Sequence, residues 1–261
     1  FEVDGQPNAA ADGDDTLDGN DDEDGVTFIT SIVPGTTASI EVVASANTCT
    51  LSAWIDFGAD GDWTTAGDDI SPGGTVLSAG TNTLFFPVPA TAAIGDTYAR
   101  FRCTTTGPVL PTGFVSDGEV EDYLVTIVAA QDWGDAPDPN YPTLSSNNGA
   151  YHTLDGVTYL GAGVDVDLDG QPNGTASGDD GDGNDDEDGV TFITALTPGS
   201  NATIDVVASA ACTLSAWIDF NGDGNWTTAG DDIFPGGTAL TVGTNILIFP
   251  VPATAVNGTT Y

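Results

Sequence analysis

The sequence of 261 residues contains no lysine and no methionine, and only two arginines oppose its 40 acidic residues. Because phosphate binding needs basic patches, this scarcity of positive charge argues against nucleic acid and against anionic membrane surfaces as partners. His152 is the sole histidine, so a histidine-based catalytic triad or zinc site cannot be assembled. No apolar run approaches the roughly 20 residues of a transmembrane helix, and we expect no membrane insertion.

The net charge of −38 is the most unusual property of the chain. Like charges keep a protein soluble, but their mutual repulsion opposes a compact state. High external salt or bound cations can offset this repulsion. The apolar share of 39% lies in short alternating runs of valine, isoleucine, phenylalanine and tryptophan, so we still expect a folded core.

Two copies of one repeat are visible in the chain. The string "VTFIT" begins at Val26 and again at Val190, and "LSAWIDF" begins at Leu51 and again at Leu214. These offsets indicate a unit of about 164 residues, which predicts a tandem array rather than a single domain.

The repeat predicts a division of the chain into three parts. We expect residues 1–128 to be the C-terminal part of the first copy and 150–261 to be the N-terminal part of the second. The segment 129–149 is rich in proline and asparagine and is expected to be a linker. The second copy stops before the equivalent of residues 99–127, so we expect its last strands to come from further sequence of the polypeptide or from a neighbouring subunit.

The hydrophobic pattern predicts β-strands throughout. Apolar residues alternate along 49–57 and again along 37–46, which is the period of a strand with one buried face. Short strands separated by glycine, proline and aspartate turns are typical of antiparallel β-sandwiches. The expected fold is therefore all-β, with tandem antiparallel β-sandwich modules, immunoglobulin-like or jelly-roll-like, that carry acidic calcium-type loops.

Cys49 and Cys103 both lie on the apolar faces of their predicted strands. A disulfide between them would bridge the sandwich and would imply an oxidising, extracytoplasmic compartment. The alternative is a pair of buried free thiols. Cys212 matches Cys49 in the second copy, and the odd cysteine count follows because its partner would fall beyond Tyr261.

The most specific motif lies in the second copy. Asp219, Asn221 and Asp223 alternate and precede Gly224, as in the first half of the calcium loop D-x-[DN]-x-[DN]-G. Oxygen ligands at alternate positions can wrap one Ca²⁺, with the carbonyl of Asn225 as a further ligand.

The first copy has one side-chain ligand fewer, because Gly58 stands at the third position, and we expect weaker binding there. The alternative for both loops is a polar hairpin without metal. The ligands expected in the two loops are Asp56, Asp60, Asp62, Asp68, Asp69, Asp219, Asn221, Asp223, Asn225, Asp231 and Asp232.

A second acidic cluster includes the string "GNDDEDGVTFIT", which occurs once in each copy. Carboxylates so close together repel one another, and bound Ca²⁺ would relieve that repulsion. The alternative is a solvated charged face. The candidate ligands are Asp14, Asp21, Asp22, Asp24, Asp169, Asp180, Asp185, Asp186 and Asp188.

The motif "SDGEVEDYLVTI" at Ser116–Ile127 resembles the GEVED-domain repeats of large bacterial cell-surface and secreted proteins. "DWGDAPD" at Asp132–Asp138 and "YLGAGVDVDLDGQPN" at Tyr159–Asn173 are similar to the pattern of the same family. The resemblance implies an extracellular or cell-surface location and a multi-domain, adhesin-like architecture. It implies no reaction, and no carboxylate pair stands out as catalytic, so we do not expect an enzyme.

These observations predict a structural repeat module of an extracellular fibre or adhesin stalk, stabilised by Ca²⁺ and disulfides. Its partners would be neighbouring copies of itself in a head-to-tail array. The alternative is a carbohydrate- or cell-binding module that uses Trp54 and Trp217, whose side chains point away from the apolar face of their strands. Candidate glycan acceptors are Asn173, Asn201 and Asn257.

Overall fold

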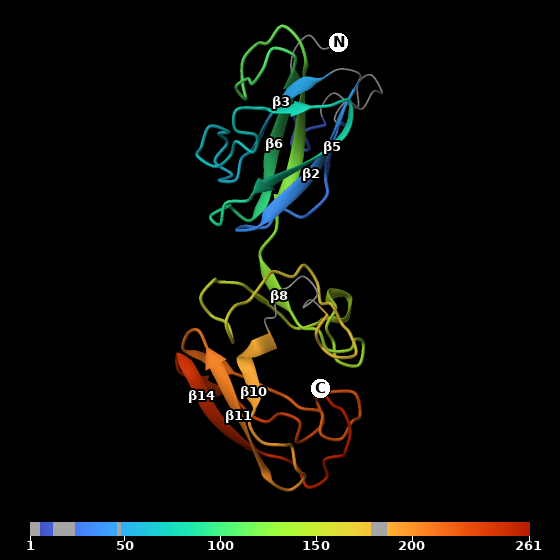
Figure 1. The fold of residues 1–261 in the computed structure, drawn as a ribbon, viewed down its shortest axis with the longest axis vertical. Coiled ribbons are helices and arrows are strands. Elements are labelled where there is room, and N and C mark those ends of the chain that lie inside the picture. Colours follow the sequence, from blue (N-terminus) through green and yellow to red (C-terminus); the bar gives the residue numbers. More distant parts are fainter. Residues whose placement is uncertain (1–5, 13–23, 46–47, 179–186) are drawn as a thin grey trace. The chain divides into compact units, whose positions relative to one another are not determined.

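The structure is a computed structural model, and it describes residues 6–12, 24–45, 48–178 and 187–261. The chain divides into two compact units, Phe1–Ala129 and Ala130–Tyr261 (Figure 1). Apart from short 3₁₀ turns at Ser145–Asn147 and Glu187–Gly189, the named elements of the described residues are β-strands. None of the described segments forms a helix long and apolar enough to cross a bilayer.

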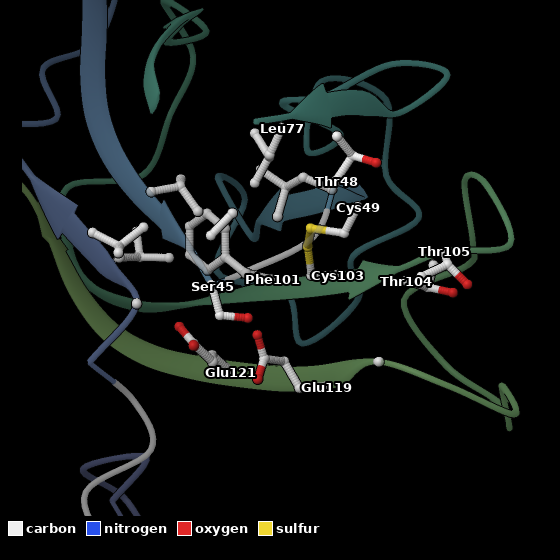
Figure 2. Close-up of a pocket in the computed structure, with 17 residues that line it drawn as sticks. Ser45, Thr48, Cys49, Leu77, Phe101, Cys103, Thr104, Thr105, Glu119 and Glu121 are labelled. Atoms are coloured by element: carbon white, nitrogen blue, oxygen red, sulfur yellow. A yellow bond between two sulfur atoms is a disulfide. The ribbon is translucent and has the colours of Figure 1, made fainter. Parts of the chain in front are cut away.

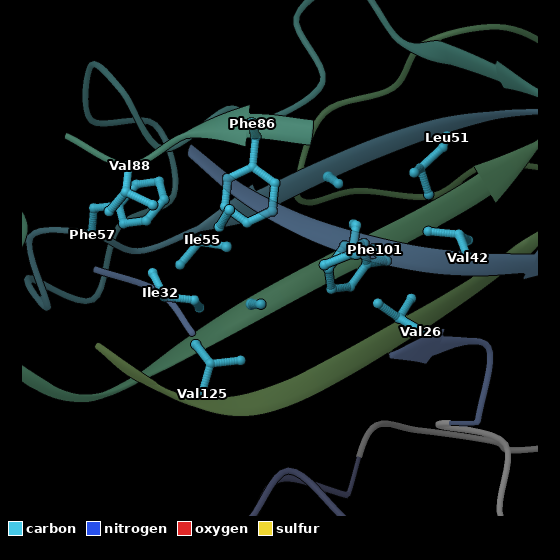
Figure 3. Close-up of a cluster of buried hydrophobic side chains, with 14 of the residues drawn as sticks. Val26, Ile32, Val42, Leu51, Ile55, Phe57, Phe86, Val88, Phe101 and Val125 are labelled. Atoms are coloured by element: carbon cyan, nitrogen blue, oxygen red, sulfur yellow. The ribbon is translucent and has the colours of Figure 1, made fainter. Parts of the chain in front are cut away.

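Unit 1 is a β-sandwich built from two antiparallel sheets. The first sheet has the order β1-β2-β5, and the second has the order β4-β3-β6-β7. The strands are β1 (Val26–Phe28), β2 (Thr37–Ala44), β3 (Cys49–Ile55), β4 (Thr75–Leu77), β5 (Gly80–Pro87), β6 (Gly95–Thr104) and β7 (Glu119–Ile127). Inward-facing side chains such as Val42, Leu51 and Phe86 form the core between the sheets (Figure 3). The all-β sandwich predicted from the alternating pattern is confirmed.

A long loop, residues 105–118, covers the outer face of β3 and β6. The Ser52 hydroxyl accepts a hydrogen bond of 3.0 Å from the N–H of Val109, and the Arg102 guanidinium donates to the carbonyls of Leu110 and Gly113. Trp54, which lies on the same face of β3, is therefore only 5% exposed. This finding contradicts the use of Trp54 as an open platform for sugars, because the unit buries it.

Unit 2 repeats the pairing of unit 1 in its first sheet, which has the order β10-β11-β14. Ile204 pairs with Leu247 as Ile40 pairs with Leu84 in unit 1. The core contains Val206 and Phe249, among others. The strands of unit 2 are β8 (Gln131–Trp133), β9 (Tyr151–Thr153), β10 (Val190–Phe192), β11 (Asn201–Ala208), β12 (Cys212–Leu214), β13 (Thr238–Leu240) and β14 (Gly243–Pro250).

The segment 129–149, which we expected to be a linker, is packed into unit 2 from residue 130 onward. Its strand β8 pairs with β9, and the ring of Trp133 stacks on Tyr151 with a centroid distance of 4.4 Å. Tyr141 is buried as well. The segment differs from a linker because its large aromatic side chains find partners in the module that follows it.

The second sheet of unit 2 is smaller than its counterpart in unit 1. In the described part of unit 2, β12 pairs with β13 alone, whereas β3 in unit 1 lies between β4 and β6. Trp217, the equivalent of Trp54, is 46% exposed.

Candidate functional site

The loop after β12 in unit 2 is organised around Asp219, which is fully buried. Its Oδ1 accepts hydrogen bonds from the N–H groups of Gly222 and Asp223, at 2.7 Å and 3.2 Å. Its Oδ2 accepts from the N–H of Gly224 at 2.9 Å. Aspartate side chains commonly stabilise turns in this way, since they bond to backbone N–H groups a few residues ahead. The motif D-x-[DN]-x-[DN]-G therefore folds the chain tightly around one carboxylate.

Asp231 closes the loop from its other end. It is 2% exposed, and its Oδ1 accepts a hydrogen bond of 3.1 Å from the N–H of Phe220. Its Oδ2 is buried and has no hydrogen-bond partner. A buried carboxylate oxygen without a partner is costly, because it has lost its water and gained nothing in exchange. The loop thus contains one unsatisfied acceptor.

An aromatic cluster seals the loop. The hydroxyl of Tyr141 donates a hydrogen bond of 2.7 Å to Oδ2 of Asp219. The Tyr141 ring contacts the rings of Trp226 and Tyr261, with centroid distances of 4.7 Å and 5.1 Å. Trp226 is held in turn by the hydrogen bond from its indole N–H to the Tyr261 carbonyl. The segment before the module therefore reaches over its acidic loop.

The loop of unit 1 has the same plan. Asp56 accepts hydrogen bonds from the N–H groups of Asp60 and Gly61, at 3.1 Å and 2.8 Å. Asp68 is 1% exposed and accepts from the N–H of Phe57, while its Oδ2 is buried without a hydrogen-bond partner. The orphan oxygen therefore occurs at the same position in both copies of the repeat.

In unit 1 a cation contacts the ring of the loop tryptophan. The Arg100 guanidinium lies 4.2 Å from the centre of the Trp63 ring and forms two hydrogen bonds with Asp122. Trp63 corresponds to Trp226, and its indole N–H also bonds to a tyrosine carbonyl, that of Tyr98. The hydrogen bond from the loop tryptophan to a tyrosine carbonyl therefore recurs in both units.

Burial and hydrogen bonding shift the pKa values of the two buried carboxylates of the unit 2 loop in opposite directions. Burial raises the pKa of Asp231, and repulsion from Asp219 and Asp223 raises that pKa further. Burial also raises the pKa of Asp68. Burial opposes ionisation of Asp219 too, but the hydrogen bonds from Tyr141 and the loop N–H groups prevail and keep its pKa below the ordinary value. The loop of unit 2 therefore pairs a hydrogen-bonded carboxylate, Asp219, with one whose charge is poorly compensated, Asp231.

The remaining loop residues form outward-facing turns. Asp223 accepts from the Thr228 hydroxyl and from the Asn221 amide, and Asn225 accepts from the N–H of Thr227. In unit 1, Asp60 and Asp62 are arranged in the same way, with Thr65 and Thr64 as their respective donors. Asp69 and Asp232 each cap a backbone N–H two residues ahead.

The donor set of the loops fits a hard cation, because it consists of oxygen atoms and includes an orphan carboxylate oxygen in each copy. Among the described residues, no three acidic, histidine or cysteine side chains gather as a ready-made metal site. Most of the loop carboxylate oxygens instead accept hydrogen bonds from backbone N–H groups or hydroxyls.

The second acidic cluster lies mainly outside the described residues, which exclude Asp14, Asp21, Asp22, Asp180, Asp185 and Asp186. Asp24 is described and is exposed. Asp169 accepts hydrogen bonds from the N–H and hydroxyl of Ser145, which hold its pKa below the ordinary value. Asp188 accepts from the N–H of Ala162. Asp169 and Asp188 thus stabilise loops of unit 2.

Cys49 and Cys103 form a disulfide across neighbouring strands β3 and β6, with Cα atoms 5.8 Å apart. The predicted pairing is confirmed, although the bond lies within one sheet rather than across the sandwich. Cys212 is a free, half-buried thiol. Of the candidate glycan acceptors, Asn201 and Asn257 are exposed, and the Asn173 side chain accepts from the N–H and hydroxyl of Thr175.

Sequence reasoning did not predict the burial of two residues, Tyr141 and Glu121. Tyr141 stands in a segment whose prolines and asparagines suggested a linker. Glu121 is 8% exposed and lies on the inner face of β7, where it accepts a hydrogen bond of 2.7 Å from the Tyr123 hydroxyl. The alternation of Glu121 with Tyr123, Val125 and Ile127 was a signal that could have placed it inside.

A known protein family matches one segment in each copy of the repeat. Residues 50–126 and 213–261 match the family model of the GEVED domain. The first match runs from β3 to β7 and includes the motif at 118–122 that the resemblance was based on. The predicted resemblance is therefore confirmed in both copies. No curated protein matches the chain.

Solved structures give only distant similarity. Alpha-2-macroglobulin of Escherichia coli, activated by porcine elastase, aligns with 87% of this chain at 12% identity and a TM-score of 0.23. A mutant alpha-2-macroglobulin of Salmonella aligns with 87% at 13% identity and a TM-score of 0.26. The chain spans 20% and 15% of the lengths of those two proteins. Similarity at this level supports no functional inference.

Proposed function

Residues 50–126 of unit 1 and 213–261 of unit 2 match the GEVED domain model, and from this premise we propose that the chain is a structural repeat module of an extracellular surface fibre or adhesin stalk. Neighbouring copies join head to tail, Ca²⁺ binds in the acidic loops, and the disulfide stabilises the sandwich. The module has no catalytic role in this proposal.

The observation that supports the proposal is the repetition of one module along the chain. The sheet β10-β11-β14 of unit 2 has the same pairing as the sheet β1-β2-β5 of unit 1. The acidic loop also recurs, with a buried carboxylate oxygen that lacks a hydrogen-bond partner at the same position in each copy. Repeated units of this kind are typical of arrays in which each unit contacts its neighbours. Head-to-tail contacts that do not close into a ring generate filaments.

The disulfide supports the extracellular part of the proposal. Disulfides such as Cys49–Cys103 persist in oxidising compartments and are rare where glutathione and thioredoxin keep thiols reduced. The absence of lysine and the net charge of −38 suit an exported protein exposed to divalent cations.

Calcium is proposed because the loops hold oxygens that lack a positive partner. Asp56, Asp60 and Asp68 would hold the ion in unit 1, and the equivalent Asp219, Asp223 and Asp231 would hold it in unit 2. The orphan Oδ2 atoms of Asp68 and Asp231 are the specific support. A bound Ca²⁺ would supply a positive charge to carboxylates that repel one another.

The alternative of a carbohydrate-binding module has less support. A tryptophan platform would have to be exposed in both copies, and Trp54 is buried.

Self-association of purified residues 1–261 tests the proposal by mass measurement and electron microscopy. We expect linear oligomers that grow with concentration. Trp217 is a large aromatic ring that is 46% exposed, so we place it in the contact between copies and expect Trp217→Asp to abolish the oligomers without unfolding the chain. Val242→Asp is the matched control, since Val242 is 69% exposed elsewhere on unit 2. A chain that stays monomeric at all concentrations, with and without Ca²⁺, would overturn the proposal. Association of Trp217→Asp equal to that of the wild type would do the same.

A further inference from the structure

In the part of the chain that the structure describes, β5 and β14 each leave a long edge of their sheet unpaired. They are the outermost strands in the orders β1-β2-β5 and β10-β11-β14, as the red strand β14 shows in Figure 1. Each has eight residues. The edge is free in unit 1, which contains β6 and β7, and equally in unit 2, which contains β8 and β9. It is therefore a property of the repeated sheet, independent of the strands that differ between the units.

The backbone of β14 alternates between groups that bond inward and groups that point outward. The N–H of Val251 donates to the carbonyl of Ser200 and so belongs to a hydrogen-bonded pair with the neighbouring chain. In an antiparallel ladder such pairs recur at every second residue. The N–H and C=O groups of the residues between them therefore point to the free edge. On β14 these residues are Thr244, Ile246 and Ile248.

The two free edges lack the protection that the other edges have. Exposed edge strands promote association unless they are short, charged or interrupted. Apart from β7, the other named strands at sheet edges have three residues each. β7 is long but carries Glu119, Glu121 and Asp122, and the first two carboxylates are visible in Figure 2. The sequences of β5 and β14, GTNTLFFP and GTNILIFP, contain no charged residue.

Apolar side chains stand beside the free edges. Ile246 and Ile248 on β14 and Phe85 on β5 are exposed. They lie on the outer face of their sheets, because the alternate residues Phe86 and Phe249 face the cores. Strands that pair with these edges would bring apolar side chains together across the contact and remove them from water.

The lack of charge indicates which partner fits. An edge that recognises a basic peptide would present acids to it, and the chain has 40 acidic residues to supply them. None of them lies on β5 or β14. A second copy of this acidic chain, in contrast, needs a contact without carboxylates, because like charges directly opposite one another destabilise a strand pair.

We propose that the free edges of β5 and β14 are lateral docking sites for a second copy of this chain, and that each edge pairs antiparallel with the same edge of its partner. Backbone hydrogen bonds extend the sheet across the contact, as in other cases of strand addition. Pro87 and Pro250 end the usable edges, because proline has no N–H to donate. The contact goes beyond the head-to-tail array, since it joins copies side by side.

Pairing of β14 around Ile246 satisfies the backbone and separates the charges. A two-fold axis between the two Ile246 residues places each outward N–H opposite a carbonyl of the partner. Asp205 on β11 pairs with Ile246 within its own unit. The two Asp205 residues of paired copies are therefore three strand spacings apart, about 14 Å. Salt at physiological ionic strength screens charges beyond about 8 Å, so little repulsion acts between them.

One such edge is a small interface, so the contact between single chains is weak and gains strength from repetition along an array. Hydrogen exchange of the whole chain at increasing concentration, in high salt, tests it directly. We expect the amides of Thr244, Ile246 and Ile248 to exchange roughly tenfold more slowly at high concentration than in dilute solution. The inward amide of Leu247 is the internal control and should be protected at both. Unchanged exchange of the three outward amides up to the solubility limit would overturn the lateral contact.

Two substitutions compare the edge with the same sheet face away from it. Ile246→Asp places a carboxylate opposite its own copy across the two-fold axis, so we expect the concentration-dependent protection of Thr244 and Ile248 to disappear. Ile193→Asp is the matched control, since Ile193 is an exposed isoleucine that follows β10 on the far side of β11. It should leave the protection unchanged. Equal effects of the two substitutions would contradict the assignment.

A further variant guards against misfolding of Ile246→Asp. Ile246→Pro removes the outward N–H but no hydrogen bond of the inner ladder, and proline is tolerated on edge strands for this reason. We expect it to remove the protection of Thr244 and Ile248 as well. Thr83→Asp is the equivalent change on β5 and should remove the protection of Thr81 and Phe85. Full protection in a folded Ile246→Pro chain would overturn the pairing.

The Trp217→Asp chain separates the lateral contact from the fibre. It lacks the proposed head-to-tail contact, and we expect it to keep the concentration-dependent protection of the β14 amides. Loss of that protection would show that the edges do not pair on their own and would overturn the inference. Linear oligomers of the wild type without protected β14 amides would overturn the lateral contact and leave the fibre in place. Protected amides without linear oligomers would overturn the fibre and leave the lateral contact in place.

Discussion

The hydroxyl of Tyr141 donates a hydrogen bond to the buried carboxylate of Asp219, 78 residues further along the chain. This contact ties the segment that precedes the sandwich of unit 2 to the acidic loop within it. Three sets of contacts therefore hold the loop: the hydrogen bonds from its own backbone N–H groups to Asp219, the hydrogen bond from Phe220 to Asp231, and the aromatic cluster.

Replacement of Tyr141 by phenylalanine tests this contact. Because a hydrogen bond to a buried charged group contributes about 2 kcal/mol, we expect Tyr141→Phe to lower the free energy of unfolding of unit 2 by about that amount. Tyr261→Phe is the matched control, since it changes a tyrosine in the same cluster whose hydroxyl bonds to the exposed carbonyl of Gly174. Denaturant titration followed by tryptophan fluorescence measures both. Equal effects of the two substitutions would contradict the special role of Tyr141.

Calcium should reverse the effect of the Asp231→Asn substitution on the melting temperature. In millimolar Ca²⁺ we expect Asp231→Asn to lower the melting temperature, because the variant loses a ligand. In EDTA we expect the same variant to be at least as stable as the wild type, because it removes a buried charge whose Oδ2 has no partner.

Asp205→Asn on β11 is the control for the loss of one charge away from the loop and should show no such reversal. Scanning calorimetry in the two buffers gives the comparison. Identical wild-type melting curves in EDTA and in Ca²⁺ would refute calcium binding.

The sequence predicts the sandwich well because its strands are governed by local alternation. The pattern at 49–57 identifies β3 and places Cys49 and Leu51 on the inner face. The same reasoning on β6 places Cys103 inward, and the two cysteines form the disulfide. These features depend on neighbouring residues in one strand, so the sequence alone contains enough information.

Trp54 and Tyr141 show where local reasoning fails. Alternation places Trp54 on the outer face of β3, and this is correct, but the loop 105–118 folds over that face through hydrogen bonds with Ser52 and Arg102. Tyr141 is surrounded by residues typical of a linker, yet it contacts a carboxylate far along the chain. Both outcomes depend on packing between distant segments, which periodicity does not contain.

The spacing of acidic and amide residues identifies the acidic loops, but it does not predict the hydrogen bonds within them. The spacing of Asp219 and Asp223 indicates oxygen ligands for a cation. The structure shows the same oxygens bound to backbone N–H groups, which hold the turn by themselves. Turn formation and ion binding use the same residue types at the same spacing, so the motif alone does not distinguish them.

Loss of the disulfide should destabilise unit 1 selectively. We expect the double substitution Cys49→Ala and Cys103→Ala to lower the free energy of unfolding of unit 1 by about 2–4 kcal/mol, because the bridge restricts the unfolded chain. Cys212→Ala is the control, since Cys212 is free and lies in unit 2. Mass spectrometry of peptic fragments, prepared without a reducing agent, checks the pairing. Two free thiols at Cys49 and Cys103 would contradict it.

Glu121 should make the stability of unit 1 depend on pH around neutrality. Burial among the inner side chains raises its pKa from 4.5 to about 7, against the opposing effect of the Tyr123 hydrogen bond, and repulsion from Glu119 and Asp24 adds to the rise. The folded state therefore favours the neutral carboxyl group. Its contribution to stability is fully present below pH 4.5 and is lost as the pH rises through about 7.

Glu121→Gln retains the shape and the acceptor for Tyr123 but carries no charge at any pH. We expect this variant to match the wild type near pH 4.5 and to be more stable at pH 8, by an amount on the order of 3 kcal/mol, the equivalent of its pKa shift. Glu119→Gln removes one charge from the same strand at an exposed position and should give a much smaller difference. Urea titrations of unit 1 unfolding at a series of pH values between 4.5 and 8 measure the effect. A constant difference between Glu121→Gln and the wild type across this range would show that the buried carboxyl group does not control the pH dependence.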